Sequence, residues 1–514
     1  MTVNKPDPLP KGVVAEPSGS SHHHFRTDHL LWNLKDRTIS SGVVTVLAQG
    51  AKFVMTLAST VIMARLLTPQ DFGLVAMVLA VTGFLRIFKD AGLSAATVQR
   101  EGITHAQVSN LFWINVAISA VMTLIVAAGA PLIAWFYREP HLTRMALALS
   151  LTFILSGTTV QHVALLNRQM RFKVSAGIDL GSMFISIVTG VVMALLGCGY
   201  WSLVASSLSF EATALVLTWT ASSWRPQLPT RGSGTRSLIH FGANLTVANF
   251  LASLARGADA LVIGRHYGPV PLGLYTRASG LLTRPLEQFL APINAVFMPT
   301  LSRLQTQPKR YRATFLRVFE MIALIGFPFS GLFLAVSRPL TLVLLGRKWE
   351  EAAVIFGGFT LLALYTPLSS AASWLYTSQG RGRDFLVWTT LSAILTVVSF
   401  LAGLPWGPFG VALSFSASSL LVRLPILYYL VGRSGPVSTR DLWSVFVKHL
   451  PLWAMVLVGT WLPHYWVAGF PPAVQLLVCV PAGLLTAAVS IMILPSSRRV
   501  ALQLIGTLKS IKSH

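Results

Sequence analysis

Two arginines, Arg277 and Arg284, stand seven residues apart in an apolar stretch that covers residues 256–305. Seven residues correspond to about two helical turns, so both side chains lie on one helix face, about 10 Å apart along the axis. A charged group at membrane depth costs roughly 2.5 kcal/mol or more, and it therefore normally faces protein or a wet cavity. Two inward-facing guanidinium groups on an apolar helix indicate a cavity for a negatively charged substrate.

The same stretch contains Arg256, Asp259 and Glu287, which allow a second interpretation. Arg256 with Asp259, and Arg284 with Glu287, are spaced i, i+3, so they could be local ion pairs that neutralise each other. Arg277 has no acidic residue at such a spacing. The sequence therefore favours a cationic cavity and leaves local pairing open.

The composition places these charges in a membrane protein. Of the 514 residues, 53% are hydrophobic and 11% charged, and the mean hydropathy is +0.64. Soluble domains carry about a quarter charged residues. Fourteen apolar segments are long enough to span a bilayer, which takes about 20 helical residues. They lie near residues 41–66, 72–90, 109–137, 145–166, 174–197, 199–219, 238–264, 270–299, 318–337, 352–377, 385–404, 408–431, 446–467 and 472–495. The predicted fold class is all-α, a polytopic membrane protein with about 14 transmembrane helices.

The net charge of +23 does not indicate a nucleic-acid partner, because the basic residues lie mainly between the apolar segments. With a cytoplasmic N-terminus, 28 basic residues fall inside, seven fall outside and five lie within spans. Cytoplasmic loops carry the excess of lysine and arginine in membrane proteins. The sequence therefore predicts both termini on the cytoplasmic side of a bacterial inner membrane.

Other features of the sequence favour neither a metal, a cofactor nor catalysis. Cys198 and Cys479 both lie in apolar surroundings, which supports neither a disulfide framework nor a metal cluster. Residues 1–38 are polar, have no cleavable signal peptide, and are predicted to be disordered. Their run of three histidines, 22–24, is interpreted as incidental. We expect no enzyme activity.

An ungapped internal repeat relates the two halves of the chain. Shifting the sequence by 200 residues gives seven identities across 33 positions, between 42–74 and 242–274. Six spans separate the copies, and an even number preserves direction, so the repeat is parallel. Transporters built from such repeats bind substrate near the membrane midplane and alternate access by rocking their halves. Chance similarity between apolar helices explains the alanine and leucine matches but not a repeated Arg-x-x-x-Pro-x-x-x-Gly-Leu.

The repeated turn has the features of a hinge at the outer rim. An arginine complements the carbonyl end of the outgoing helix. A proline then separates two helices, and a glycine allows close backbone approach in the returning helix. The predicted rim residues are Arg65, Pro69 and Gly73 in the first copy and Arg265, Pro269 and Gly273 in the second.

The repeat also adds candidates to the cavity. Arg256 corresponds to Thr56, four residues beyond Lys52, so the two cations lie on the same face of equivalent helices. The candidate substrate-binding cations are Lys52, Arg256, Arg277 and Arg284. Asp179 and Glu211, within the fifth and sixth spans, could carry coupling protons or pair with other helices. With Asp259 and Glu287 they form the set of candidate carboxylates.

Two blocks of sequence carry a family resemblance. Residues 64–73, Ala-Arg-Leu-Leu-Thr-Pro-Gln-Asp-Phe-Gly, resemble the signature after the first helix of bacterial polysaccharide flippases. Residues 272–305, with Leu-Gly-Leu-Tyr-Thr-Arg-Ala, Arg-Pro-Leu-Glu-Gln and Pro-Thr-Leu-Ser-Arg-Leu-Gln, are similar to the Wzx-type branch, which moves lipid-linked oligosaccharides. The parent group is the multidrug/oligosaccharidyl-lipid/polysaccharide exporter superfamily. The resemblance covers roughly residues 39–435, and Glu287 departs from it where a neutral amide is expected.

The resemblance implies two pseudo-symmetric six-helix lobes in a V shape, with the substrate diphosphate held by cavity arginines. The two last helices resemble the pair that accommodates the lipid tail in lipid II flippases. The expected organisation is a cytoplasmic tail (1–38), an N-terminal lobe (39–220), a linker (221–236), a C-terminal lobe (237–435), two further transmembrane helices (436–495) and an amphipathic cytoplasmic tail (496–514).

Three functional hypotheses remain at this stage. The first is a flippase that carries undecaprenyl-diphosphate-linked oligosaccharide across the inner membrane for exopolysaccharide, O-antigen or capsule synthesis. The second is an ion-coupled drug exporter of the same superfamily, which should favour acidic cavity residues. The third is a membrane polymerase or acyltransferase, which usually needs a large outer loop or clustered histidines and aspartates. Expected partners are the lipid-linked oligosaccharide and membrane lipid, with a polysaccharide polymerase and a chain-length regulator as further candidates.

Overall fold

The computed structural model describes residues 34–88, 90, 92–100, 102–230, 257–495 and 497–502. These residues form helices and connecting turns, and no strand occurs among them. The chain is therefore all-α, as its composition predicts. Predictions that concern residues 1–33, 231–256 (the end of the linker and most of the seventh predicted span, with Arg256) and 503–514 lie outside the described residues.

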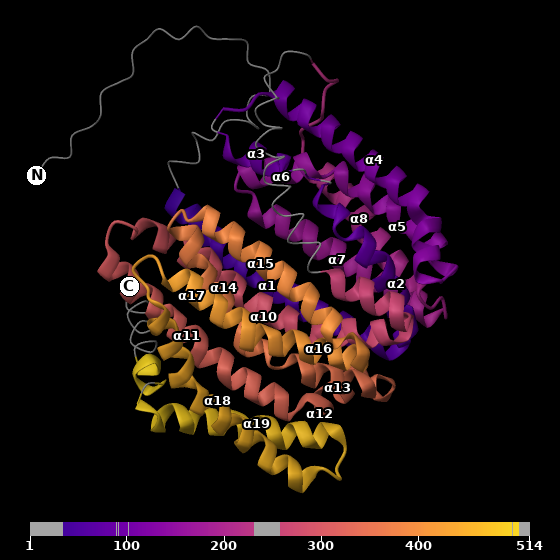
Figure 1. The fold of residues 1–514 in the computed structure, drawn as a ribbon. Coiled ribbons are helices and arrows are strands. Elements are labelled where there is room, and N and C mark those ends of the chain that lie inside the picture. The colour runs from indigo at the N-terminus through magenta and orange to yellow at the C-terminus, as the bar shows by residue number, and fades with distance from the viewer. Residues whose placement is uncertain are drawn as a thin grey trace, which may run out of the picture.

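The first half of the chain forms a bundle that is coloured indigo to magenta in Figure 1. Its helices are α1 (Leu34–Leu66), α2 (Pro69–Thr82), α3 (Leu93–Gln99), α4 (His105–Tyr137), α5 (His141–Gly157), α6 (Val160–Arg168), α7 (Phe172–Leu195) and α8 (Trp201–Ala221). The predicted span 72–90 is divided, because α2 ends at Thr82 and a short 3-10 turn, Leu85–Ile87, follows. Gly92, at φ 67°, then turns the chain into α3.

The second half gathers on the other side of the molecule (Figure 1). After a helix over 257–267 come α10 (Pro269–Arg303), α11 (Pro308–Ala335), α12 (Ser337–Leu345), α13 (Glu350–Phe359), α14 (Leu362–Ser378), α15 (Gly382–Gly403), α16 (Gly407–Ser418), a π-helical turn (Ser419–Arg423) and α17 (Leu424–Gly432). α18 (Thr439–Val467) and α19 (Pro472–Ile493) lie at the edge and pack on α11 and α12.

In the described part of the chain, nine helical segments are long and apolar enough to cross a membrane. One of them, Gly382–Gly432, contains α15, α16 and α17. A tenth arises if Arg347–Phe359 and Leu362–Ser378, bent by 47°, form one broken span. The protein is thus a polytopic membrane protein, whereas the number fourteen remains a prediction.

Local sequence signals determine where several of these helices begin. Thr68, Thr104 and Ser438 each cap the helix that follows, since their hydroxyl groups accept a bond from the backbone N–H three residues later. The side chain at that third position bonds back to the backbone N–H of the cap residue in all three cases. These capping boxes satisfy N–H groups that a helix start leaves without a partner.

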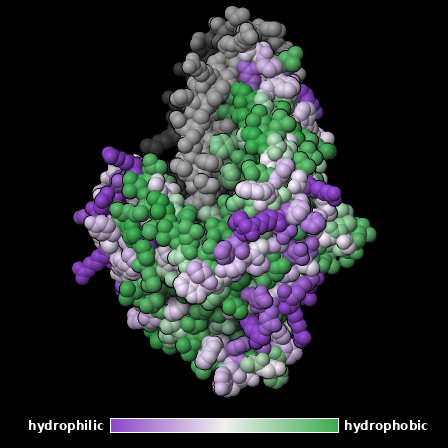
Figure 2. All heavy atoms as spheres, turned by 45° about the vertical axis from the view of Figure 1, so that its right-hand side comes forward, coloured by the Kyte–Doolittle hydropathy of each residue, from purple (hydrophilic) through white to green (hydrophobic). Residues whose placement is uncertain are grey.

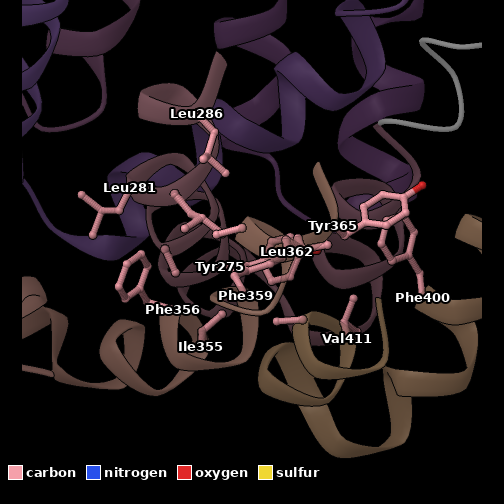
Figure 3. Packing of buried hydrophobic residues seen from close by; sticks show 14 of the residues in the cluster. Tyr275, Leu281, Leu286, Ile355, Phe356, Phe359, Leu362, Tyr365, Phe400 and Val411 are labelled. Carbon is pink, nitrogen blue, oxygen red and sulfur yellow. The ribbon is translucent and has the colours of Figure 1, made fainter. Parts of the chain in front are cut away.

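The hydrophobic core runs through the second half and reaches across to the first. Figure 3 shows part of it, where α10 meets α13 and α14. The rings of Tyr275 and Phe359 lie 5.1 Å apart there. The outer surface is also apolar over large areas (Figure 2), and side chains such as Leu421 and Leu477 are about three-quarters exposed. Exposed apolar side chains on long helices are expected where a protein faces lipid rather than water.

Candidate functional site

A cavity of about 650 Å³ lies between the two halves of the chain. Its lining residues come from α1, α2, α7 and α8 of the first half, and from α10 and Ala260 of the second. The charged residues among them are Arg277 and Arg284; no carboxylate, lysine or histidine lines the cavity among the residues that the structure describes. The two arginines from which the sequence argument starts therefore both line this cavity.

Arg277 is held against an aromatic ring from the other half of the chain. Its guanidinium carbon lies 3.7 Å from the centroid of the Phe72 ring. The ring face is negative, so it attracts the cation without neutralising it. Among the described residues, neither Arg277 nor Arg284 forms an ion pair, and the i, i+3 spacing of Arg284 and Glu287 does not produce one. Both guanidinium groups therefore line the cavity without a carboxylate partner from the part of the chain that the structure describes.

Lys52 lies near the cavity but is not one of its lining residues. Its ammonium group donates to Asp179 of α7 in an ion pair. The Lys52 carbonyl accepts a bond from Thr56, which does line the cavity, one helical turn further along α1. The structure therefore pairs the predicted cation Lys52 with the predicted carboxylate Asp179. This pair is separate from the two arginines that line the cavity.

The other carboxylates also have local partners or lie away from the cavity. Glu211 is buried and accepts from Arg86 at 3.2 Å. Asp259 accepts from the Tyr275 hydroxyl at 3.0 Å and from the Ala260 backbone N–H at 2.8 Å. Glu287 is exposed on α10. None of the four candidate carboxylates lines the cavity.

The six rim residues gather at one end of the molecule, where α2 and α10 begin. A Cβ added to Gly73 would lie 1.7 Å from the Pro269 carbonyl oxygen, and one added to Gly273 would lie 1.9 Å from the Pro69 carbonyl oxygen. The contact is reciprocal, as an approximate twofold relation between the halves requires. Only glycine permits this approach of the two backbones.

The remaining rim residues, Arg65 and Arg265, bond to other parts of the same end. Arg65 donates to the Val343 carbonyl at 2.6 Å. Arg265 lies over the Phe136 ring, 5.9 Å from its centroid. Together with Arg138 and Glu139, Arg265 lines a second, open pocket.

Sequence analysis did not identify two residues that join the halves at this rim, Lys348 and Trp349. Lys348 donates to the carbonyls of Arg65 and Leu67, both at 2.8 Å, and the indole N–H of Trp349 donates to the Ala64 carbonyl at 2.9 Å. The last carbonyls of a helix have no partner within the helix, so this pair caps the end of α1. Neither residue lies in the repeated segments 42–74 and 242–274, so the internal repeat could not indicate them.

Phe72 was also missed, although it stands within the block 64–73. Its ring contacts Arg277 on the cavity side and Trp349, at a centroid distance of 5.4 Å, on the rim side. Its sequence neighbours, Asp71 and Gly73, give no sign of such a role.

Both the sequence and the fold are similar to those of known proteins. Residues 62–354, more than half of the chain, match the family model described as polysaccharide biosynthesis protein. The chain belongs to this family. The matched segment of the polysaccharide biosynthesis family contains the two cavity arginines, all six rim residues and the pair Lys348 and Trp349.

Several curated relatives are similar over most of their length. The succinoglycan biosynthesis transport protein ExoT of Rhizobium meliloti (strain 1021) is 27% identical over 440 residues, which cover 84% of this chain and 88% of ExoT. The lipopolysaccharide biosynthesis protein WzxC of Escherichia coli (strain K12) is 24% identical over 440 residues, which cover 82% of this chain and 87% of WzxC.

Solved structures share the fold at low sequence identity. The lipid II flippase MurJ, in an inward closed conformation, superimposes with a TM-score of 0.66 at 15% identity, covering 88% of this chain and 99% of MurJ. An inward-facing multidrug resistance transporter of the MATE family, from the MOP superfamily, gives a TM-score of 0.58 at 14% identity, covering 76% and 95%. This member of the polysaccharide biosynthesis family therefore has the fold of that superfamily.

Proposed function

We propose that the protein is a flippase that moves undecaprenyl-diphosphate-linked oligosaccharide from the inner to the outer leaflet of the bacterial inner membrane. The observation that carries the proposal is the cavity between the halves, whose charged lining residues are Arg277 and Arg284. A guanidinium group presents a fork of N–H donors that matches the oxygens of a diphosphate. Family membership and the names of the relatives support the same conclusion.

In this mechanism the substrate head group enters the cavity from the cytoplasm and leaves after the halves part at the rim. The reciprocal contact of Gly73 and Gly273 supports assigning this structure to the state closed at the outer face. Closure of one face with opening of the other is the general behaviour of parallel-repeat transporters. No nucleotide-binding loop is present in the sequence, so energy comes from ion gradients or from downstream consumption of the glycan.

The proposed topology has fourteen transmembrane helices and both termini in the cytoplasm. The N-terminal lobe covers residues 39–220, the C-terminal lobe 237–435, and two further helices 436–495. Contacts at the rim support this arrangement, because they join turns near residues 65, 265 and 348 that the basic-residue distribution assigns to the same outer face. A polysaccharide polymerase and a chain-length regulator are the proposed downstream partners.

The ion-coupled drug exporter is less well supported by the cavity. A pocket for cationic drugs should present carboxylates, and none occurs among the lining residues in the described part of the chain. We assign Asp179 and Glu211 to ion pairs with Lys52 and Arg86, so a coupling proton would have to break an existing pair.

The proposal is tested by Arg277→Ala and Arg284→Ala, singly and together. Each substitution removes donors that the diphosphate uses, and hydrogen bonds to charged groups contribute about 1.5–3 kcal/mol. We expect each single variant to lower transport of a fluorescent undecaprenyl-diphosphate-linked glycan in proteoliposomes by about tenfold or more. Arg277→Lys should keep part of the activity, because it keeps the charge but not the planar fork.

Arg303→Ala is the matched control, since Arg303 is exposed at the far end of the same helix and is not among the cavity-lining residues. It should transport at the wild-type rate. Wild-type transport by the double alanine variant, at normal protein level, would reduce Arg277 and Arg284 to packing roles.

A further inference from the structure

The cavity carries a second chemical feature that its arginines do not explain. Six hydroxyl side chains line it on three helices of the first half. They are Thr56, Ser59 and Thr60 of α1, Ser186 of α7, and Ser206 and Ser207 of α8. We refer to this set as the hydroxyl wall; the arginines come from α10, in the second half.

Most hydroxyl groups of the wall already use their hydrogen within the protein. Thr56 and Thr60 each donate to the carbonyl four residues earlier, both at 2.8 Å, and Ser207 donates to the Leu203 carbonyl at 2.9 Å. Ser186 donates to the Ser206 carbonyl, also at 2.8 Å, and the two serine hydroxyls share a further bond. Each hydroxyl group has one donor and two acceptor sites. What remains for a ligand is therefore mainly acceptor capacity.

The two sides of the cavity therefore differ in hydrogen-bonding character: the arginines lie on α10, which contributes one lining hydroxyl, Thr276, whereas the first half contributes six. Arginine side chains donate and cannot accept, so Arg277 and Arg284 suit phosphate oxygens. The hydroxyl wall accepts, so it suits O–H and N–H groups of a ligand. A carboxylate has only acceptor oxygens, so its lone pairs would face the lone pairs of the hydroxyl oxygens in the wall.

We propose that the hydroxyl wall binds the sugar next to the diphosphate and selects a neutral, donor-rich sugar over an acidic one. The inference rests on the proposed flippase function and adds the class of sugar and its orientation. The diphosphate lies against α10 and the first sugar against α1, α7 and α8. A substrate held in this way spans the seam between the two halves, which must move for transport.

Some of these hydroxyls also serve helix packing, so the test uses the α1 residues. Ser206 lies within 3.1 Å of a Cβ added to Gly190, and small residues let membrane helices approach closely. Thr→Val keeps the shape of the side chain and removes the acceptor. The double variant Thr56→Val with Thr60→Val therefore removes sugar acceptors without changing how the helices pack.

The experiment measures binding to the purified protein in nanodiscs with three probes: undecaprenyl diphosphate, undecaprenyl-diphosphate-glucose and undecaprenyl-diphosphate-glucuronate. Wild-type protein should bind the glucosyl lipid about tenfold more tightly than the sugar-free lipid, because two or more hydrogen bonds are gained. It should bind the glucuronyl lipid no more tightly than the sugar-free lipid. The double valine variant should bind glucosyl and sugar-free lipids within about twofold of each other.

Thr389→Val is the matched control. Thr389 of α15 makes the same bond to the carbonyl four residues earlier, at 2.8 Å, and does not line the cavity. It should keep the wild-type preference. The thermal unfolding temperature of each variant is measured alongside to confirm that the fold is kept.

The outcomes separate this inference from the proposed function. Arg277→Ala should weaken binding of all three lipids by a similar factor and leave the glucosyl preference in place. A double valine variant with the wild-type preference, or equally tight binding of the glucuronyl lipid by wild-type protein, overturns the role of the hydroxyl wall and leaves the flippase standing. If none of the three lipids binds, the proposed function and this inference both fall.

Discussion

At the scale of single residues, Phe72 connects the cavity to the rim. One side of its ring holds the guanidinium group of Arg277 at 3.7 Å, and Trp349 packs against it with ring centroids 5.4 Å apart. Trp349 in turn donates to the carbonyl of Ala64 at the end of α1. A diphosphate that draws Arg277 away from the ring would therefore remove one support of the closed rim. We therefore expect substrate binding and rim opening to be coupled through Phe72.

Phe72→Leu tests the shared role. Cation–π attraction contributes about 0.5–2 kcal/mol, and leucine keeps an apolar side chain without it. In the leucine variant a ligand no longer has to displace Arg277 from the ring. We therefore expect undecaprenyl diphosphate to bind this variant at least about threefold more tightly than it binds wild-type protein in a nanodisc assay. Phe72→Tyr keeps the ring and should bind the lipid as wild-type protein does. Equal affinity in the leucine variant and the wild-type protein would show that the ring and the diphosphate do not compete for Arg277.

At the scale of elements, the closed rim depends on two helix starts that meet without side chains between them. α2 and α10 each begin at a proline, and the glycine four residues later lies against the other proline's carbonyl. The end of α1 is then capped by Lys348 and Trp349 from the segment between α12 and α13. Helices of both halves are thereby held at one end, while the cavity lies beneath them.

Gly73→Ala should prevent this closure. The added Cβ would lie 1.7 Å from a backbone oxygen, a contact that no rotamer change can relieve. We expect at least a tenfold loss of transport in proteoliposomes with a normal amount of folded protein. Gly129→Ala, on α4 with nothing within 4 Å of the added atom, is the control and should transport normally. Full transport by Gly73→Ala would show that tight closure is dispensable.

At the scale of the whole molecule, the proposed mechanism requires the halves to part at the rim. The 200-residue repeat makes Gln70 and Val270 equivalent, and both side chains are exposed beside the prolines that meet there. Cysteines at these two positions should crosslink in the closed state, and the crosslink should stop transport until it is reduced. A crosslinked protein that still delivers lipid-linked sugar to the outer leaflet would leave only a static groove for the head group.

Orientation in the membrane has an independent test. Arg347, in the segment that caps α1, is predicted to face outward, and Lys309, at the start of α11, to face the cytoplasm. In intact cells, an impermeant thiol reagent should label Arg347→Cys and spare Lys309→Cys, since the excess of basic residues lies on the inner side. The opposite pattern of labelling would reverse the topology.

The class of fold and the position of Arg277 and Arg284 on one helix face follow from the sequence alone, because both depend on local rules. Helix length and hydropathy identify membrane helices, and a seven-residue spacing puts Arg277 and Arg284 on one face. The gapless repeat predicted the equivalence of Pro69 and Pro269, which the reciprocal glycine contacts display. These inferences need only the periodicity of a helix and the energetic cost of charge in an apolar medium.

Only the tertiary structure decided which groups from distant segments meet. Lys52 and Asp179 are separated by 127 residues, and Trp349 and Ala64 by 285. No local spacing predicts such pairs, because the contact depends on how whole helices pack. The same holds for the hydroxyl wall, since serine and threonine can bond to a carbonyl of their own helix whether or not they line a cavity. Whether a hydroxyl lies partly exposed on the outside, as Thr389 does, or lines a cavity, as Thr60 does, depends on which helices surround it.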